Sequence, residues 1–89
     1  MIERTLTLSN RLGLHARAAS KLVRTADRFE AEVWLEHDGR RVNAKSIMGV
    51  LLLAAPCGTE LLVVCEGPDE DQAMEALASL VDARFGEDQ

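Results

Sequence analysis

The spacing of apolar residues changes period several times along this chain of 89 residues, and those changes limit the possible folds more than any other feature. Near the start, Leu6 and Leu8 alternate with threonines, which predicts a half-buried strand over residues 2–9. From Ala16 to about Phe29 the apolar positions recur at helical spacing, and basic residues occupy the other faces. The chain therefore opens with a strand followed by an amphipathic helix.

The middle of the chain repeats this change of period. Residues 31–35 alternate between apolar and polar, and the Asp-Gly pair at 38–39 is typical of a hairpin turn into a second strand around 40–44. Ser46 is a good N-cap residue, so a second helix is expected to begin there and to stop before Pro56.

The last third supplies one more strand and one more helix. Residues 60–66 form an apolar run of strand length, and Asp69 with Gln72 resembles a capping box for a helix that ends near Gly86. The order is β-α-β-β-α-β-α. We therefore predict an α+β fold, an open-faced sandwich with a four-stranded antiparallel sheet and three helices on one face, with residues 1–89 as a single domain.

Charge is distributed unevenly along the chain. The net charge is −5, but residues 1–45 hold nine of the ten Lys and Arg with six acids, a net of +3, whereas residues 46–89 carry −8. Such asymmetry can steer an anionic ligand or an acidic partner to one face, although two solvated halves would show the same pattern. An acidic total with only 3% aromatic residues disfavours nucleic-acid binding.

Two further features bear on location and metals. The start is polar, and the longest uncharged stretch, between Lys45 and Glu60, is broken by glycine and proline and is too short to span a bilayer. We therefore expect a cytoplasmic protein without membrane insertion. The two cysteines are expected to be free thiols, and their spacing relative to the two histidines matches no metal site, so none is predicted.

The start of the first helix is the most informative local feature. Leu14, His15 and Ala16 supply no side chain that could accept from the free amides, so these donors are left open. The partial positive charge of the helix end disfavours a protonated imidazole and so keeps His15 a neutral nucleophile. A phosphoryl group on His15 would meet the amides of residues 16–18 and the Arg17 guanidinium. A histidine at a helix start can equally be a structural coincidence.

Two motifs that lie apart in the sequence favour a functional role for His15 over a structural coincidence. Residues 13–17 read Gly-Leu-His-Ala-Arg, and residues 43–48 read Asn-Ala-Lys-Ser-Ile-Met. Together with Gly58, the turn at 67–70 and the Phe-Gly-Glu sequence at 85–87, they resemble the family of histidine-containing phosphocarrier proteins, HPr, of the bacterial phosphotransferase system. The resemblance runs from end to end.

The resemblance implies a function and a set of partners. His15 would accept a phosphoryl group at Nδ1 from enzyme I and pass it to a histidine of an enzyme IIA domain. The amides of Ala16, Arg17 and Ala18 and the Arg17 guanidinium would bind the phosphate. The chain would need no cofactor of its own, since Mg²⁺ and phosphoenolpyruvate are used by enzyme I. Ser46 would be, in some bacteria, a regulatory site for an HPr kinase/phosphorylase.

One position departs from the family pattern. The family usually has Pro after the His-Ala-Arg motif, and this chain has Ala18. Proline is favoured in the first turn of a helix because its missing N–H has no partner there, so Ala18 adds one free donor. We expect phosphoryl transfer to survive this change.

The second helix is apolar around nearly its whole circumference. Helix-on-helix packing could cover the face that does not meet the sheet. The resemblance instead implies a docking surface beside His15, made of Ile47, Met48 and Leu51 with a basic rim of Arg17, Lys21, Arg24 and Lys45.

These inferences describe a monomeric covalent carrier between enzymes rather than a free-standing turnover enzyme. The alternative is a regulatory protein-binding module in which phosphorylation of His15 or Ser46 acts only as a switch.

Overall fold

The computed structural model describes residues 1–87, and its elements follow the predicted order. They are β1 (Ile2–Thr7), α1 (Ala16–Asp27), β2 (Glu32–His37), β3 (Arg40–Asn43), α2 (Ile47–Leu52), β4 (Glu60–Glu66), α3 (Glu70–Asp82) and a short 3₁₀ turn, η1 (Arg84–Gly86). None of the helices in residues 1–87 is long and apolar enough to cross a membrane.

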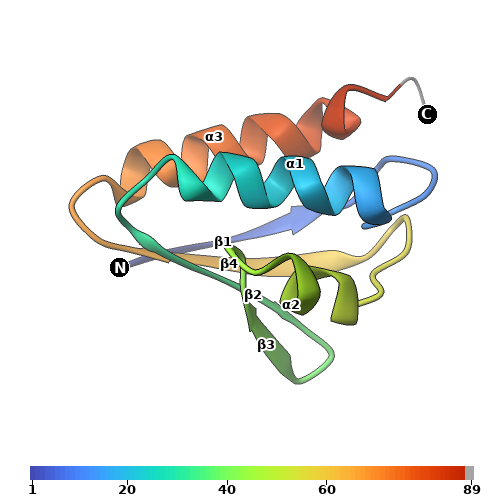
Figure 1. Ribbon diagram of the computed structural model, residues 1–89, viewed down its shortest axis with the longest axis horizontal. Helices are drawn as coiled ribbons and strands as arrows, with labels where there is room; N and C mark the ends of the chain where they lie inside the picture. Colours follow the sequence, from blue (N-terminus) through green and yellow to red (C-terminus); the bar gives the residue numbers. More distant parts are fainter. Residues whose placement is uncertain (88–89) are drawn as a thin grey trace.

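The four strands form one sheet in the order β1-β4-β2-β3, and every neighbouring pair is antiparallel. Helices α1 and α3 run side by side over one face of this sheet, and α2 lies beside β3 and against α1 (Figure 1). The predicted open-faced sandwich is therefore confirmed.

The core lies between the sheet and the helices. Alternate strand residues such as Leu35, Leu61 and Val63 point inward and are at most 2% exposed. They meet the apolar stripes of α1 and α3, of which Leu22 and Leu77 are the largest members and are each 1% exposed. The apolar residues that alternate in the strands and recur at helical spacing in the helices thus form one continuous core.

The second helix is shorter than its apolar sequence suggests. It ends at Leu52, and Ala54 takes a left-handed conformation with φ +49°. Leu53 and Ala55 then turn into the core, with exposures of 7% and 2%, and the Ala55 carbonyl accepts from the Leu14 amide at 2.9 Å. Burial of these two side chains outweighs the propensity to continue the helix.

The predicted capping box at the start of α3 is wrong. The Asp69 side chain makes no hydrogen bond to its own helix and instead accepts from the amides of Glu30, at 2.9 Å, and Ala31, at 2.8 Å. Glu70 takes part of the expected role, since its carboxylate accepts from the Gly67 amide at 3.0 Å. Tertiary contacts with the segment before β2 thus redirect the aspartate.

Two glycines lie where the chain packs closely near the helix starts. Gly13 has φ +62°, and a Cβ there would lie 2.3 Å from the Ala55 carbonyl oxygen. Gly49, which lowers the helix propensity of α2, faces β3 so closely that a Cβ would lie 3.3 Å from Cβ of Val42. A side chain at this position would require Val42 to move by a few tenths of an ångström, which is a packing reason for glycine inside this helix.

Candidate functional site

His15 is the N-cap residue of α1. Its backbone is extended, with φ −74° and ψ 175°, its side chain makes no capping hydrogen bond, and the first turn contains no acid. The first intrahelical bond runs from the Ala19 amide to the His15 carbonyl at 2.8 Å. Within residues 1–87 no acceptor meets the amides of residues 16–18, so the helix end is uncapped, as predicted. Ala16 and Arg17 are exposed there, whereas Ala18 is fully buried.

The loop that carries His15 is held by backbone hydrogen bonds to the loop before β4. The Leu8 amide donates to the Thr59 carbonyl at 2.9 Å, and the Gly58 amide donates to the Leu8 carbonyl at 2.7 Å. With the bond from Leu14 to the Ala55 carbonyl, these contacts fix the position of the helix start. The imidazole itself is 25% exposed, so an incoming group can reach it.

The four cations predicted around the site divide into two kinds. Arg17 is exposed and makes no hydrogen bond or ion pair within residues 1–87, and Arg24 makes only a 3.4 Å contact to the Ser20 hydroxyl. The ammonium groups of Lys21 and Lys45 instead donate to main-chain carbonyls at 2.6 and 2.7 Å. The two arginines are therefore the cations that remain available to an anion or a partner.

An apolar surface is exposed on α2. Ile47, Met48 and Leu51 are 39%, 71% and 38% exposed, so contact with α1 does not cover the helix and the packing alternative is wrong for this face. Leu52, at 61%, extends the surface, and Leu12, at 65%, stands out from the loop before His15. Neither Leu12 nor Leu52 was predicted to belong to the docking surface, because the exposure of a side chain depends on tertiary packing. Several large apolar side chains exposed on one short helix are typical of a protein–protein contact.

Ser46 is the N-cap of α2, as predicted. Its hydroxyl oxygen accepts a hydrogen bond from the Gly49 amide at 3.1 Å. The side chain is partly exposed, so it serves its own helix while remaining at the surface.

The C-terminal segment adds a contact that the sequence reasoning missed. Oε2 of Glu87 lies 2.5 Å from Nε2 of His15, and Oε1 of the same carboxylate accepts from Nδ2 of Asn10 at 3.1 Å. Nδ2 of Asn10 also donates to the Gly13 carbonyl at 2.7 Å. Figure 1 shows η1, which directly precedes Glu87, on the same side of the molecule as the loop between β1 and α1. The only sequence signal was that residues 85–87 belong to the family pattern.

The environment of Glu87 favours its ionised form. Burial by itself would raise the pKa of this carboxyl group. The hydrogen bonds from Asn10 and His15, helped by the charges of His15 and Lys21, outweigh that effect and lower the pKa below its ordinary value. Glu87 is therefore a hydrogen-bond acceptor at neutral pH.

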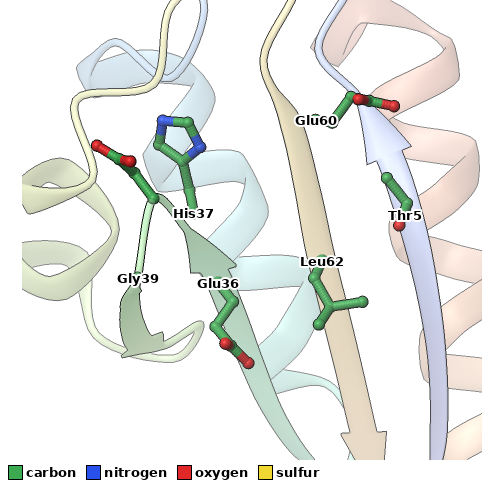
Figure 2. Close-up of a pocket in the computed structure, with 7 residues that line it drawn as sticks. Thr5, Glu36, His37, Gly39, Glu60 and Leu62 are labelled. Carbon is green, nitrogen blue, oxygen red and sulfur yellow. The ribbon is translucent and has the colours of Figure 1, made fainter.

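A hollow lies on the open face of the sheet, away from His15. Figure 2 shows Thr5, Glu36 and Leu62 on adjacent strands, with His37 and Glu60 at the same end of the sheet. No helix covers this face, and the hollow is lined mainly by polar and acidic groups. It is separate from the His15 site and brings no nucleophile together with an anion-binding group.

The two cysteines do not form a disulfide. Cys57 is exposed and Cys65 is buried in β4, and burial raises the pKa of the Cys65 thiol to about 11. A thiol with so high a pKa is unreactive at neutral pH, as expected for a structural residue.

Fold and site together define a class of small α+β proteins that present one histidine at an uncapped helix start beside an exposed apolar surface. Residues 2–83 match the family model described as PTS HPr component phosphorylation site. The chain is 54% identical over 88 residues to the phosphocarrier protein HPr of Xylella fastidiosa, covering 99% of each chain.

Solved structures agree with this match. The crystal structure of HPr-C-His from Thermoanaerobacter tengcongensis superposes with a TM-score of 0.97 and 43% identity over all of both chains. An HPr dimer from the same organism matches with a TM-score of 0.79 and 44% identity, over 98% of this chain and 100% of that one. The chain belongs to the HPr family of the phosphotransferase system and has its phosphocarrier role.

Proposed function

We propose that His15 is the residue that carries the phosphoryl group, taking it from phosphorylated enzyme I and delivering it to a histidine of an enzyme IIA domain. The observation that carries this proposal is the position of an accessible imidazole at a helix start whose first amides have no acceptor in residues 1–87. Such an end binds a phosphate through its N–H groups and its dipole. His37, in contrast, ends strand β2 and does not stand at the N-terminus of any helix in residues 1–87.

In the transfer step a ring nitrogen of His15 attacks phosphorus, and the bond from phosphorus to the donor's nitrogen breaks. The electron pair of the broken bond stays on the donor. The phosphoryl oxygens then lie against the amides of Ala16 and Arg17, and the Arg17 guanidinium can add a charge-assisted hydrogen bond. Ala18, which stands in place of the usual proline, is fully buried, so the amides of the exposed residues Ala16 and Arg17 are the ones that a phosphate can reach directly.

Partner binding would use the exposed face of α2. Ile47, Met48 and Leu51 supply the apolar contact, and methionine adapts well to surfaces of different shape. Arg17 and Arg24 form the charged rim, while Lys21 and Lys45 contribute positive charge from positions held by main-chain carbonyls. Rim charges mainly raise association rates, which suits a carrier that must exchange partners quickly.

The remaining parts of the proposal concern the setting of the reaction. The carrier would need no cofactor, with Mg²⁺ and phosphoenolpyruvate used by enzyme I in the cytoplasm. We propose a monomeric working form, because successive partners need the same apolar surface. Ser46 would be the site at which an HPr kinase/phosphorylase regulates docking. It directly precedes Ile47 and Met48 of the docking surface in the chain and is the N-cap of their helix.

The test is to incubate the protein with enzyme I, Mg²⁺ and ³²P-labelled phosphoenolpyruvate. We expect one acid-labile, base-stable phosphate, mapped to His15 and absent from His15→Ala. His37→Ala is the matched control and should be labelled at the wild-type rate. Full labelling of His15→Ala would contradict the proposal, and an unlabelled wild-type protein that still binds enzyme I would favour the regulatory binding module.

A further inference from the structure

The network that joins Asn10, Glu87 and His15 is built from a fully buried side chain outward. Asn10 is 0% exposed, and its Nδ2 donates both to the Gly13 carbonyl at 2.7 Å and to Oε1 of Glu87 at 3.1 Å. Its Oδ1 is buried without a hydrogen-bond partner in residues 1–87. An unpaired buried oxygen is costly, so the position of this amide needs an explanation beyond stability.

The two neighbours of Nδ2 determine how the Asn10 amide is oriented. A main-chain carbonyl and a carboxylate can only accept, so the group that faces them must be the NH₂ rather than the oxygen. Asn10 therefore holds one oxygen of Glu87 and leaves the other, Oε2, directed at the imidazole, 2.5 Å from Nε2 of His15.

The backbone before Glu87 is shaped to bring its carboxylate to this point. Arg84, Phe85 and Gly86 take left-handed conformations in succession, with φ of 55°, 56° and 79°. The Phe85 side chain is 1% exposed in the core, and its carbonyl accepts from the Lys21 ammonium at 2.6 Å. Non-glycine residues rarely adopt this conformation, and here the buried ring and the lysine stabilise it.

A carboxylate at Nε2 determines which ring nitrogen can act as a nucleophile. Because an ionised carboxylate has no proton to donate, Nε2 must carry the proton, and the lone pair of the neutral ring is then on Nδ1. We propose that Glu87, oriented by Asn10, is a positioning residue that selects Nδ1 of His15 as the phosphoryl acceptor. The inference rests on the proposed function, in which His15 is the carrier residue.

The same contact also stabilises the product. When the Nδ1 lone pair forms the new bond to phosphorus, the donor's nitrogen–phosphorus bond breaks and the donor keeps that electron pair. The proton stays on Nε2, so the imidazole ring becomes cationic while the phosphoryl group lies at the amides of α1. Glu87 then faces the cationic ring through a charge-assisted hydrogen bond, much as the aspartate of a catalytic triad stabilises its imidazolium.

Three variants of the full chain test the inference with enzyme I, Mg²⁺ and labelled phosphoenolpyruvate as probes. Glu87→Gln should be phosphorylated at His15 roughly tenfold to a hundredfold more slowly, the range for outer hydrogen-bond partners of a functional histidine. Asn10→Ala should also be slow, with little further loss when it is combined with Glu87→Gln, because Asn10 acts through Glu87. Glu32→Gln, an exposed acid on the far face of the sheet, should match the wild type.

A spectroscopic readout separates positioning from a merely structural role. In ¹⁵N-labelled wild-type protein we expect a slowly exchanging Nε2–H signal from His15, and coupling of ³¹P to Nδ1 after phosphorylation. The Nε2–H signal should exchange rapidly with water in Glu87→Gln. Wild-type protein with its proton on Nδ1, or phosphate on Nε2, would overturn the inference whether or not the variants fold. An unchanged rate for Glu87→Gln, with label still on His15, would overturn it while leaving the proposed function intact.

Discussion

The starts of helices α1 and α2 show opposite solutions to the same problem. At α2 the Ser46 hydroxyl accepts from the Gly49 amide at 3.1 Å and so satisfies one of the free donors. At α1 the N-cap residue is His15, and its side chain turns to Glu87 instead of to its own helix. Both N-cap residues are partly exposed, so the difference is not one of burial.

The comparison indicates what the open end costs and what it provides. A serine, threonine, asparagine or aspartate N-cap is typically worth about 1 kcal/mol relative to alanine. That stabilisation is absent at α1, where the unpaired amides form an anion site for a group carried on the imidazole. At α2 the cap is present, and the functional surface lies on the exposed side chains that follow it.

Substitutions of His15 should have the largest effect, and they should affect phosphorylation and the stability of α1 independently. We expect His15→Ser and His15→Ala to lose all phosphorylation by enzyme I, because both remove the nucleophile. His15→Ser should nevertheless be more stable than His15→Ala by about 1 kcal/mol, because serine can accept from the open amides. Urea unfolding of the two variants measures the difference. Equal stabilities would show that the amides of α1 are not free in the way the structure describes.

A negative charge at the start of α2 should act on docking and not on folding. We expect Ser46→Asp to slow phosphorylation of His15 by enzyme I by about tenfold, because the added charge repels an acidic partner surface. Its melting temperature should stay nearly unchanged, since aspartate is also a good N-cap. Steady-state transfer rates and a thermal melt are the two measurements. Transfer at the wild-type rate would count against docking beside Ser46.

Removing the cap of α2 should have the smallest effect, and only on stability. Ser46→Ala is expected to cost about 1 kcal/mol, equivalent to about 4–8 °C in melting temperature for a domain of this size. Phosphorylation of His15 should be unaffected, because the serine hydroxyl takes no part in the transfer. Loss of phosphorylation in this variant while it remains folded would assign Ser46 a direct role in the active site.

Much of the fold was predictable because it follows from local periodicity. The order of elements, the span of β4 and the apolar stripes of α1 and α3 all come from patterns within single segments. The capping-box prediction was wrong because it concerns a group with a choice of partners: Asp69 binds the amides of Glu30 and Ala31 rather than its own helix. The hydrogen bond from the Lys45 ammonium to the Phe29 carbonyl is likewise a contact that the sequence did not predict.

The candidate site also has one part that the sequence predicted and one part that it did not. The sequence by itself determined that α1 begins without a capping side chain and that His15 and Arg17 stand at that end, because capping depends on the identity of a few adjacent residues. Only the tertiary structure decided that Asn10 and Glu87 meet at the imidazole, 77 positions apart in the chain. Contacts at such separation depend on how the whole core packs, which no local pattern encodes.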